Sequence, residues 1–432
     1  MKNLENRDIT MPLQFSPVIL RDYHFSSLRQ RLFESLDQFN IWPSDSGARI
    51  LVKPNLNANM NALTGNTTDL RLLAAIIGYL KARGYRHITL GEGTNSGYYR
   101  AKIGVIERLM VDRLARHFDV ELIDFNYAPG RPIDFEQGET AMVAAPCLES
   151  DFFVNVPKLK THSEALMSGC LKNLVGCLVG QESKKKTHQS LAANICNINV
   201  AVRPHLHIVD ALVAMEGLGP TRGTPVVLDS LIIGTDPFVI DWVLARIMQF
   251  DPQAVPVLAE AEKRGQLDEE KRHTAESVDV SAVSRPFAPP QPGRLAAFIH
   301  HPRRQKYFMA VRNAPFVKAM ADTALFGKFM VALGLRQDVF ISQDMRLERL
   351  VYDPARCTNC GQCLKYCPLG NDPRNKTEDD PCLGCLYCFM VCPHVAYTFE
   401  GEMGFLEEQM RQYDHLIRAF ETCDRQSVDP TS

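Results

Sequence analysis

The sequence predicts an α/β protein whose mostly parallel sheet has helices on both faces, followed by a small cysteine-rich α+β module. Two observations predict this architecture. Across residues 1–280, short apolar runs alternate with segments of helical period, which is the pattern of β-α-β folds. Across residues 357–392, two runs of cysteines share one spacing, which indicates a separate unit.

Apolar periodicity places the elements of the large domain. Residues 70–83 carry leucine and isoleucine at helical spacing, and Gly84 is expected to end that helix. A second helix is expected over 105–118. The apolar runs that are too short for helices are predicted strands, at residues 48–52, 87–90, 120–125, 152–156, 207–209 and 231–234.

Proline and charge divide the rest of the chain. Residues 286–292 read Pro-Phe-Ala-Pro-Pro-Gln-Pro, which is typical of a linker. A basic segment with helical character follows, and an amphipathic helix is expected over 402–422. The predicted units are an α/β domain (1–285), a linker with the basic segment (286–345), the cysteine module (346–400), and a C-terminal helix and tail (401–432).

Composition excludes several classes of function. The formal net charge of the chain is −2, so no basic field favours nucleic acid or an anionic membrane as a partner. No apolar run approaches the roughly 18 residues that a membrane span needs. Residues 1–20 contain Glu5, Arg7 and Asp8 and do not resemble a signal peptide. We therefore expect a cytoplasmic protein.

The cysteine runs carry the most specific chemistry. Both read C-x₂-C-x₂-C-x₃-C-P, with Pro368 and Pro393 after their last cysteines. This is the spacing of bacterial ferredoxins with two [4Fe–4S] clusters, in which the fourth cysteine of each run binds the other cluster. The resemblance implies one quartet of Cys357, Cys360, Cys363 and Cys392, and a second of Cys382, Cys385, Cys388 and Cys367.

Two alternatives stand beside this interpretation. Structural zinc also uses C-x₂-C pairs, but with four ligands in two pairs rather than triplets followed by Cys-Pro. The clusters could also serve only to hold the module together, although one cluster would suffice for that. We expect two clusters that carry electrons, and a soluble electron carrier or redox partner protein as the partner.

Polar segments follow several predicted strands of the large domain, where open α/β sheets bind ligands. Lys53-Pro-Asn-Leu, Pro157-Lys-Leu-Lys-Thr-His, Leu171-Lys-Asn-Leu-Val-Gly, Glu216-Gly-Leu-Gly-Pro and Thr235-Asp-Pro-Phe-Val-Ile-Asp together resemble the domain of unknown function 362. The resemblance covers about residues 48–260, and that domain is often fused to ferredoxin-type clusters. It implies domain boundaries rather than a reaction.

The residues themselves indicate a site for an anionic small molecule. Lysines on loops and helix starts would attract carboxylate or phosphate if the strand ends converge. The imidazole of His162 could move a proton near neutral pH. The catalytic candidates are Lys158, Lys160, His162 and Lys172. The substrate-binding candidates are Lys53, Asn55, Glu92, Asn173, Asp210 and Asp241.

Each candidate also has a plainer interpretation. Loop lysines are usually solvated, and His162 could be an ordinary capping residue. Glu92 could cap a helix, and Asp236 before Pro237 is expected to be an N-cap rather than a ligand. The run 184–186, three lysines, is expected to be a solvated loop.

Three functions follow from these observations. The first is an iron–sulfur oxidoreductase that passes electrons through the clusters to an anion in the large domain. The second is an electron-transfer or scaffold protein for a partner enzyme. The third is a non-redox enzyme of isomerase type, with regulatory clusters.

Overall fold

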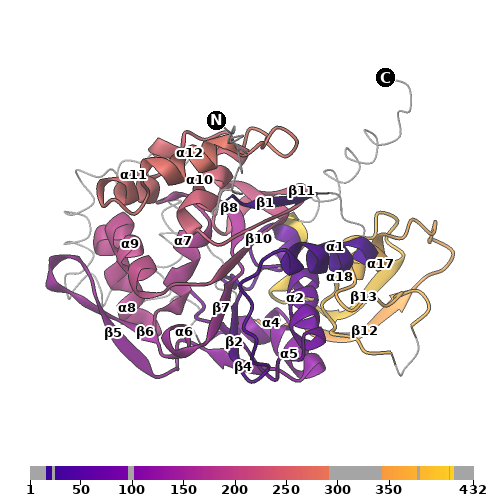
Figure 1. Ribbon diagram of the computed structural model, residues 1–432. Helices are drawn as coiled ribbons and strands as arrows, with labels where there is room; N and C mark the ends of the chain where they lie inside the picture. The colour runs from indigo at the N-terminus through magenta and orange to yellow at the C-terminus, as the bar shows by residue number, and fades with distance from the viewer. Residues whose placement is uncertain are drawn as a thin grey trace, which may run out of the picture.

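The computed structural model describes residues 16–21, 25–95, 102–290, 343–376, 380–407 and 409–412. Figure 1 shows a large α/β domain with a central sheet, and the cysteine module, in orange and yellow, beside its helices α1, α2 and α5. Among the helices of the described residues, none has both the length and the apolar character needed to cross a bilayer.

The central sheet is largely parallel, as the sequence predicts. Its strands run in the order β1-β11-β10-β7-β2-β3-β4, and β8 and β9 extend it beside β10. The bounds are β1 Val18–Arg21, β2 Arg49–Lys53, β3 His87–Glu92, β4 Glu121–Asp124, β7 Phe152–Asn155, β8 Lys158–His162, β9 Leu166–Ser168, β10 Leu206–Leu218 and β11 Arg222–Gly234. A separate hairpin consists of β5 Gly130–Asp134 and β6 Thr140–Ala144.

The order of the parallel strands reverses at β2. From β2 the chain proceeds outward through β3 to β4, then returns to β7 on the other side of β2 and continues to β10. Ligands in open α/β sheets bind beyond the strand ends at this kind of reversal. Lys53 ends β2 and Asn155 ends β7, and the two residues are paired in register there.

The antiparallel part of the central sheet is longer than the sequence predicts. Only residues 207–209 and 231–234 were expected as strands, but β10 and β11 are long strands that pair along a hairpin, with a bulge between Ala211 and Val213. The apolar alternation is hidden because β10 is buried on both faces from Leu206 to Met215.

Helices cover both faces of the sheet. One face carries α1 Phe25–Asp37, α2 Leu70–Ala82, α4 Val105–Arg108 and α5 Val111–Phe118 (Figure 1). The remaining helices of the large domain are α6 Pro146–Glu149, α7 Cys170–Asn173, α8 Gly180–Thr187, α9 Leu191–Ala201, α10 Pro237–Ile247, α11 Pro256–Lys263 and α12 Glu269–Ser277. Short 3₁₀ turns include η1 Ala62–Thr64 and η3 Leu174–Cys177.

Local signals explain where these helices begin and end. The Asp69 side chain accepts a hydrogen bond from the backbone N–H of Arg71 and caps α2, and Gly84 has a φ of 85° just after it. Asp236 caps α10, as predicted. The helix expected over 105–118 is instead divided, because Met110 takes a left-handed conformation with a φ of 60°.

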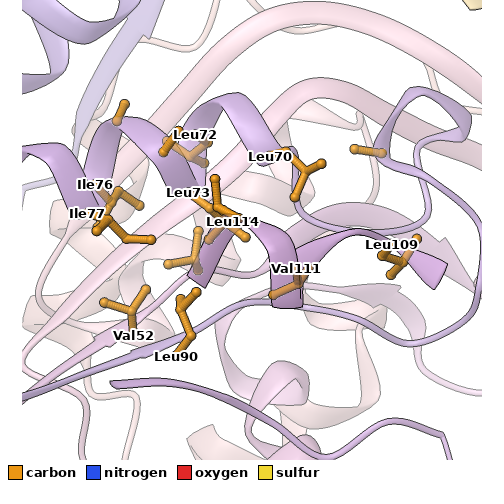
Figure 2. Packing of buried hydrophobic residues seen from close by; sticks show 14 of the residues in the cluster. Val52, Leu70, Leu72, Leu73, Ile76, Ile77, Leu90, Leu109, Val111 and Leu114 are labelled. Carbon is orange, nitrogen blue, oxygen red and sulfur yellow. The ribbon is translucent and has the colours of Figure 1, made fainter. Parts of the chain in front are cut away.

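The core joins the two units of the chain. Figure 2 shows Val52 and Leu90 of the sheet against residues of α2 and α5, among them Leu73 and Leu114. The same apolar cluster continues into the cysteine module, where it includes Tyr366, Leu383, Leu386, Tyr387 and Met390. The module is therefore packed on the large domain rather than tethered to it.

The cysteine module is built around a short antiparallel sheet. Its strands are β12 Arg346–Tyr352 and β13 Tyr397–Glu402, and its helices are α17 Gln362–Lys365 and α18 Tyr387–Met390. Most of the predicted linker and basic segment lies outside the described residues, as does the predicted C-terminal helix beyond residue 412.

Candidate functional site

The first element of the site is a buried ion pair at the centre of the sheet. Lys53 Nζ lies 2.9 Å from Glu92 Oε2, and both side chains are almost fully buried. The backbone N–H groups of Leu56 and Gly93 donate to the same carboxylate, at 3.2 and 2.8 Å. The Lys53 charge is thus balanced within the protein, which makes this lysine a support for the site rather than a free anion binder.

A row of amide side chains crosses the strand ends next to this pair. Asn55 donates to Asn173 (2.8 Å), and Asn173 donates to Asn155 (2.7 Å). Asn155 in turn lies 3.0 Å from His207 Nδ1. Because each amide uses both its oxygen and its nitrogen, the row fixes the orientation of every member. Asn55 and Asn173, predicted from sequence, are therefore brought together.

Lys160 completes this row without a carboxylate. Its Nζ donates to Asn55 Oδ1 at 2.9 Å and to the backbone oxygen of Asn66 at 2.6 Å. The side chain is 1% exposed, and no carboxylate of the described residues forms an ion pair with it. Burial, together with the charges of Lys172 and Lys158, lowers the pKa of Lys160 well below its ordinary value. Such an amine would gain its proton when an anion binds beside it.

His162 ends β8 near Lys172 and Lys160. Its Nδ1 accepts hydrogen bonds from the backbone N–H groups of Glu164 (3.1 Å) and Ala165 (3.3 Å). These bonds place the imidazole proton on Nε2. Burial lowers the pKa of His162 well below its ordinary value, and Lys172 lowers it further. The ring is therefore a neutral hydrogen-bond donor at pH 7, which revises the expectation of a group that titrates near neutrality.

Lys172 is the partly open cation of the group. It is half-buried on α7, and desolvation lowers the pKa of its amine. The nearby carboxylate of Glu164 is held by His188, whose Nδ1 lies 2.9 Å from it. Among the described residues Lys172 forms no ion pair, so no carboxylate there neutralises its charge.

Lys158 and Asp210 form a second buried ion pair. Their atoms lie 2.9 Å apart, and both side chains are completely inaccessible to solvent. The pair lies on neighbouring parallel strands, β8 and β10, which are in register at these residues. Lys158 is therefore neutralised, unlike Lys160 two residues later.

Asp241 lies behind the site rather than in it. Its carboxylate accepts the backbone N–H groups of Cys170 (2.6 Å) and Leu171 (3.1 Å), which begin α7. Burial raises the pKa of Asp241 to about 7. A β-carbon on Gly169 would lie 2.2 Å from this carboxylate, so the close approach needs glycine. Asp241 thereby positions the helix that carries Lys172 and Asn173.

Lys184 corrects the expectation of a solvated run at 184–186. It belongs to α8, is 6% exposed, and donates to the backbone oxygen of Thr94 at 2.8 Å and to the side chain of Asn126. Burial lowers its pKa to about 8. A β-carbon on Gly93 would lie 2.8 Å from its Nζ, so the amine occupies the space that a side chain at position 93 would need.

Asn57 is a further polar group that the sequence did not single out as a ligand. It follows Leu56, whose backbone N–H donates to Glu92. Its side-chain nitrogen is buried and finds no acceptor within the part of the chain that the structure describes. An unused donor at the strand ends is a feature that an anionic ligand would satisfy.

A surface cavity also opens on the opposite edge of the sheet. It is lined by residues at the amino ends of β2 and β3, including Arg49 and His87, and by Glu121. None of the predicted site residues lines it. The candidate site and this cavity are therefore distinct.

The first cysteine quartet surrounds one cavity. Cys357, Cys360, Cys363 and Cys392 all line it, so the last cysteine of the second run meets the triplet of the first. Backbone N–H groups point at two of these sulfurs, from Asn359 to Cys357 (3.4 Å) and from Ala396 to Cys392 (3.2 Å). Hydrogen bonds of this kind stabilise thiolates bound to iron.

The second run repeats the backbone of the first. Gly384 donates to Cys382 Sγ at 3.4 Å, as Asn359 does to Cys357. Left-handed residues occur at equivalent places, Asn359 and Gly361 in one run and Gly384 and Leu386 in the other. The thiols whose charges act on Cys385 are those of Cys388, Cys367 and Cys382. The two runs thus have alike backbones, and Cys367 of the first run lies near cysteines of the second.

The donor set suits a cluster better than a single ion. Within the described ranges, no group of three or more His, Cys, Asp or Glu side chains is placed to hold one metal ion. A zinc ion draws four thiolates to about 2.3 Å from one centre. The first quartet, whose four cysteines line one cavity, fits the larger [4Fe–4S] group.

Two family models match separate parts of the chain. Residues 50–246 match the family described as Domain of unknown function (DUF362), and residues 349–393 match the 4Fe-4S dicluster domain. The chain is 29% identical over 233 residues to the "Thylakoid-associated protein sll1697" of Synechocystis, covering 51% of this chain and 68% of that protein.

Two further similarities are more limited. A 57-residue stretch is 33% identical to the "Probable anaerobic dimethyl sulfoxide reductase chain YnfG" of Escherichia coli, covering 12% of this chain and 28% of that one. A crystal structure of a Thermotoga maritima protein aligns with a TM-score of 0.32 at 15% identity, over 51% of this chain and 58% of that one. The chain thus spans less than a third of the reductase relative.

Residues 50–246 therefore match the Domain of unknown function (DUF362), and residues 349–393 match the 4Fe-4S dicluster domain.

Proposed function

We propose that this protein is an oxidoreductase. Electrons from a soluble one-electron carrier pass through two [4Fe–4S] clusters to an anionic small molecule held at the carboxyl ends of β2, β7 and β8. The observation that carries the proposal is the direct packing of the cysteine module on α2. The backbone N–H of Leu70 lies 3.5 Å from the Tyr387 hydroxyl, and the Arg71 guanidinium lies 4.0 Å from the Tyr366 ring centroid.

The two quartets would have different tasks. Bound clusters supply single electrons at potentials set by hydrogen bonds and solvent exposure. Each quartet has one exposed cysteine, Cys360 in the first and Cys382 in the second, and we assign the carrier to the first quartet because the second run is packed on the large domain. Leu383 and Leu386, between the second-run cysteines, are buried in the core shared with the large domain. That end would face the substrate.

Charge supports an anion as the substrate. Lys53 and Lys158 are matched by Glu92 and Asp210, whereas Lys160 and Lys172 form no ion pair within the described residues. An anion beside these amines would raise their pKa toward the ordinary value, and the protonated amines would then attract the anion. The neutral His162 would donate its Nε2 proton to a substrate oxygen, as groups that stabilise developing negative charge do. Two carrier molecules, each giving one electron, and two protons from water would complete the two-electron reduction.

A direct test is single-turnover oxidation of the pre-reduced protein. The anaerobic full-length protein would be reduced and mixed with phosphate esters, keto acids and other carboxylates, while the visible absorbance reports cluster oxidation. We expect Lys172→Gln and Lys160→Gln each to raise the substrate concentration needed for half-maximal oxidation rate by at least about tenfold, since each removes a charged contact. Lys263→Gln, an exposed lysine, is the control. No oxidation by any anion, or equal rates in all variants, would refute the proposal.

A second function is electron transfer to a partner enzyme. The similarity of the cysteine module to a protein described as a reductase chain favours this candidate. The large domain would then dock the partner. Under this function the Lys160 and Lys172 variants would keep full activity in the partner system, and only changes at the cysteines would abolish it.

We also propose that the protein works in the cytoplasm. The iron-binding thiolates and the buried free thiols of Cys147, Cys170, Cys177 and Cys196 are suited to a reducing compartment. The relative described as thylakoid-associated offers membrane association as the alternative. Fractionation of cells, followed by immunodetection, would distinguish the two.

A further inference from the structure

A continuous chain of buried charges connects the candidate site with the cysteine module. Lys158 Nζ lies 2.9 Å from Asp210 Oδ2, and that same oxygen accepts the backbone N–H of Asp69 at 2.7 Å. The Asp69 carboxylate is held by Arg71 through two contacts, Nε at 3.0 Å and Nη2 at 2.6 Å. We call these four residues the buried ion chain. None of them is more than 2% exposed.

The far end of the buried ion chain contacts the residue next to Cys367, a member of the second cysteine quartet. The Arg71 guanidinium stacks 4.0 Å from the ring of Tyr366, the residue immediately before Cys367. Tyr366 is completely buried. The adjacent Lys365 forms an ion pair with Asp229 at 3.6 Å, so a further pair of charges flanks the same junction.

Such an arrangement is a poor way to stabilise a fold. Removing charges from water costs as much free energy as a buried ion pair returns, and apolar residues of the same size serve at least as well. The Asp210 carboxylate also accepts the backbone N–H of Asp69, which brings the carboxylates of these two residues close enough for their like charges to oppose each other. With both ionised, the buried ion chain is neutral, with two cations and two anions. One added electron nearby would disturb that balance.

We infer that the buried ion chain couples electron delivery to proton uptake, with Asp210 as the group that takes the proton when an electron reaches the quartet containing Cys367. The inference rests on the proposed electron path. In the coupled step, the carrier loses one electron, the cluster gains it, and the Asp210 carboxylate binds one proton drawn from water. The protonated acid then lies beside Lys158, at the edge of the candidate site.

The charges around Asp210 select it over Asp69. It faces Lys158 of β8 and Asp69 of the loop before α2, and its other oxygen accepts the Leu212 backbone N–H at 3.0 Å. Arg71, on α2, acts on Asp69 directly. Burial raises the pKa of Asp210. Although burial opposes it, Arg71 lowers the pKa of Asp69. Asp210 is thus the weaker acid of the two and the first to be protonated.

The test is the reduction potential of the full-length iron-loaded protein, titrated anaerobically between about pH 6 and 9. Reduction coupled to one proton lowers the potential as pH rises, by up to about 59 mV per pH unit for a one-electron couple. We expect one of the two clusters to show such a slope and the other to be nearly flat. Asp210→Asn should abolish the slope.

Asp241→Asn is the matched control. Asp241 is also a buried carboxyl, and its raised pKa of about 7 makes it the competing source of a pH effect. It lies outside the buried ion chain, so its variant should keep the slope. A slope that disappears in Asp241→Asn but persists in Asp210→Asn would overturn the inference.

A second measurement needs no variant. Infrared difference spectra of the wild-type protein, reduced minus oxidised, should show a new band of a protonated carboxyl group that shifts in heavy water. Reduction without this band would overturn the inference even if Asp210→Asn failed to fold. If the slope and the band are present but no anion oxidises the protein, the coupling stands and the proposed enzymatic function fails. If anions are reduced but the potential does not depend on pH, the proposed enzymatic function stands and the proton coupling fails.

Discussion

Lys53 and Glu92 form a buried ion pair of 2.9 Å at the ends of two neighbouring parallel strands, and Gly176 lies directly against it. A β-carbon on Gly176 would be 2.0 Å from Glu92 Oε1 and 2.8 Å from Lys53 Nζ. The backbone oxygen of this glycine also accepts the N–H of Gly93 at 3.0 Å. The loop that follows α7 is thus fitted to the ion pair.

Gly176→Ala should therefore destabilise the protein. The added methyl group must displace the carboxylate or the loop, and overpacking of this kind costs about 1–3 kcal/mol. Unfolding in urea, followed by circular dichroism, measures the free energy. Gly78→Ala is the control, because its β-carbon would meet only the Arg29 side chain at 3.6 Å or more. As a helix-interior change it should stabilise by about 0.5–1 kcal/mol. Equal effects of the two changes would contradict the packing described here.

Breaking the ion pair from one side should cost more than removing both charges. Lys53→Met leaves the buried Glu92 carboxylate without its cation, and such single losses cost about 3–5 kcal/mol. The double variant Lys53→Met with Glu92→Gln should recover a large part of that loss, since no unpaired charge remains. Urea unfolding of the two single variants and the double variant gives the coupling energy. Additive losses would show that the pair contributes nothing as a pair.

The parallel half of the fold was predictable because its signals are local. Residues 48–52 and 87–90 carry apolar runs ended by polar residues, and they are strands β2 and β3. The length of β10 was not predictable, because a strand buried on both faces loses the alternation that marks its bounds. The break at Met110 also left no sign, since methionine ordinarily continues a helix.

The site was predictable in its residue types but not in its pairings. Lys53, Lys158 and Lys160 were recognised as cations at strand ends, yet their partners lie far away in sequence. Glu92 is 39 residues from Lys53, and Asp210 is 52 residues from Lys158. A single sequence does not say which lysines are neutralised by such contacts. Lys184 was misassigned for the same reason, because its burial depends on Thr94 and Asn126, which follow the distant strands β3 and β4.

Lys184 should make stability depend on pH in the alkaline range. Its folded pKa of about 8 lies below the ordinary lysine value of 10.5, so between these values the unfolded chain binds more protons. Stability therefore rises with pH across this window, by up to about 3 kcal/mol at 1.36 kcal/mol per unit. Below pH 8 the buried amine is charged, and this contribution is absent. Urea unfolding at several pH values compares the wild type with Lys184→Gln, which should lack the rise.

Lys185→Gln serves as the control for this experiment. The neighbouring Lys185 is 47% exposed and forms only a surface ion pair with Glu182 at 3.1 Å. Its replacement should change the free energy of unfolding by less than about 0.5 kcal/mol at any pH. If Lys184→Gln and Lys185→Gln had the same pH profile, the buried position of Lys184 would be wrong.

The crossing of the cysteine runs makes a prediction about pairs of variants. Cys392 lines the cavity of the first quartet although it lies in the second run. Cys392→Ser and Cys357→Ser should therefore lose the same cluster, retain roughly half of the iron, and leave the same residual electron paramagnetic resonance signal after reduction. Cys367→Ser and Cys382→Ser should both lose the second cluster instead, so that the resonance signal of the first cluster remains.

Cys147→Ser supplies the reference for these measurements. It is a buried cysteine outside both runs, and its replacement should keep the full iron content. Iron analysis and resonance spectra of the anaerobic proteins, recorded side by side, decide between crossed and uncrossed quartets. A match between Cys392→Ser and Cys382→Ser would mean that each run binds its own cluster. Tyr366 and Arg71 would then no longer lie beside a ligand of the cluster that the second run holds, and the electron path through α2 would have to be redrawn.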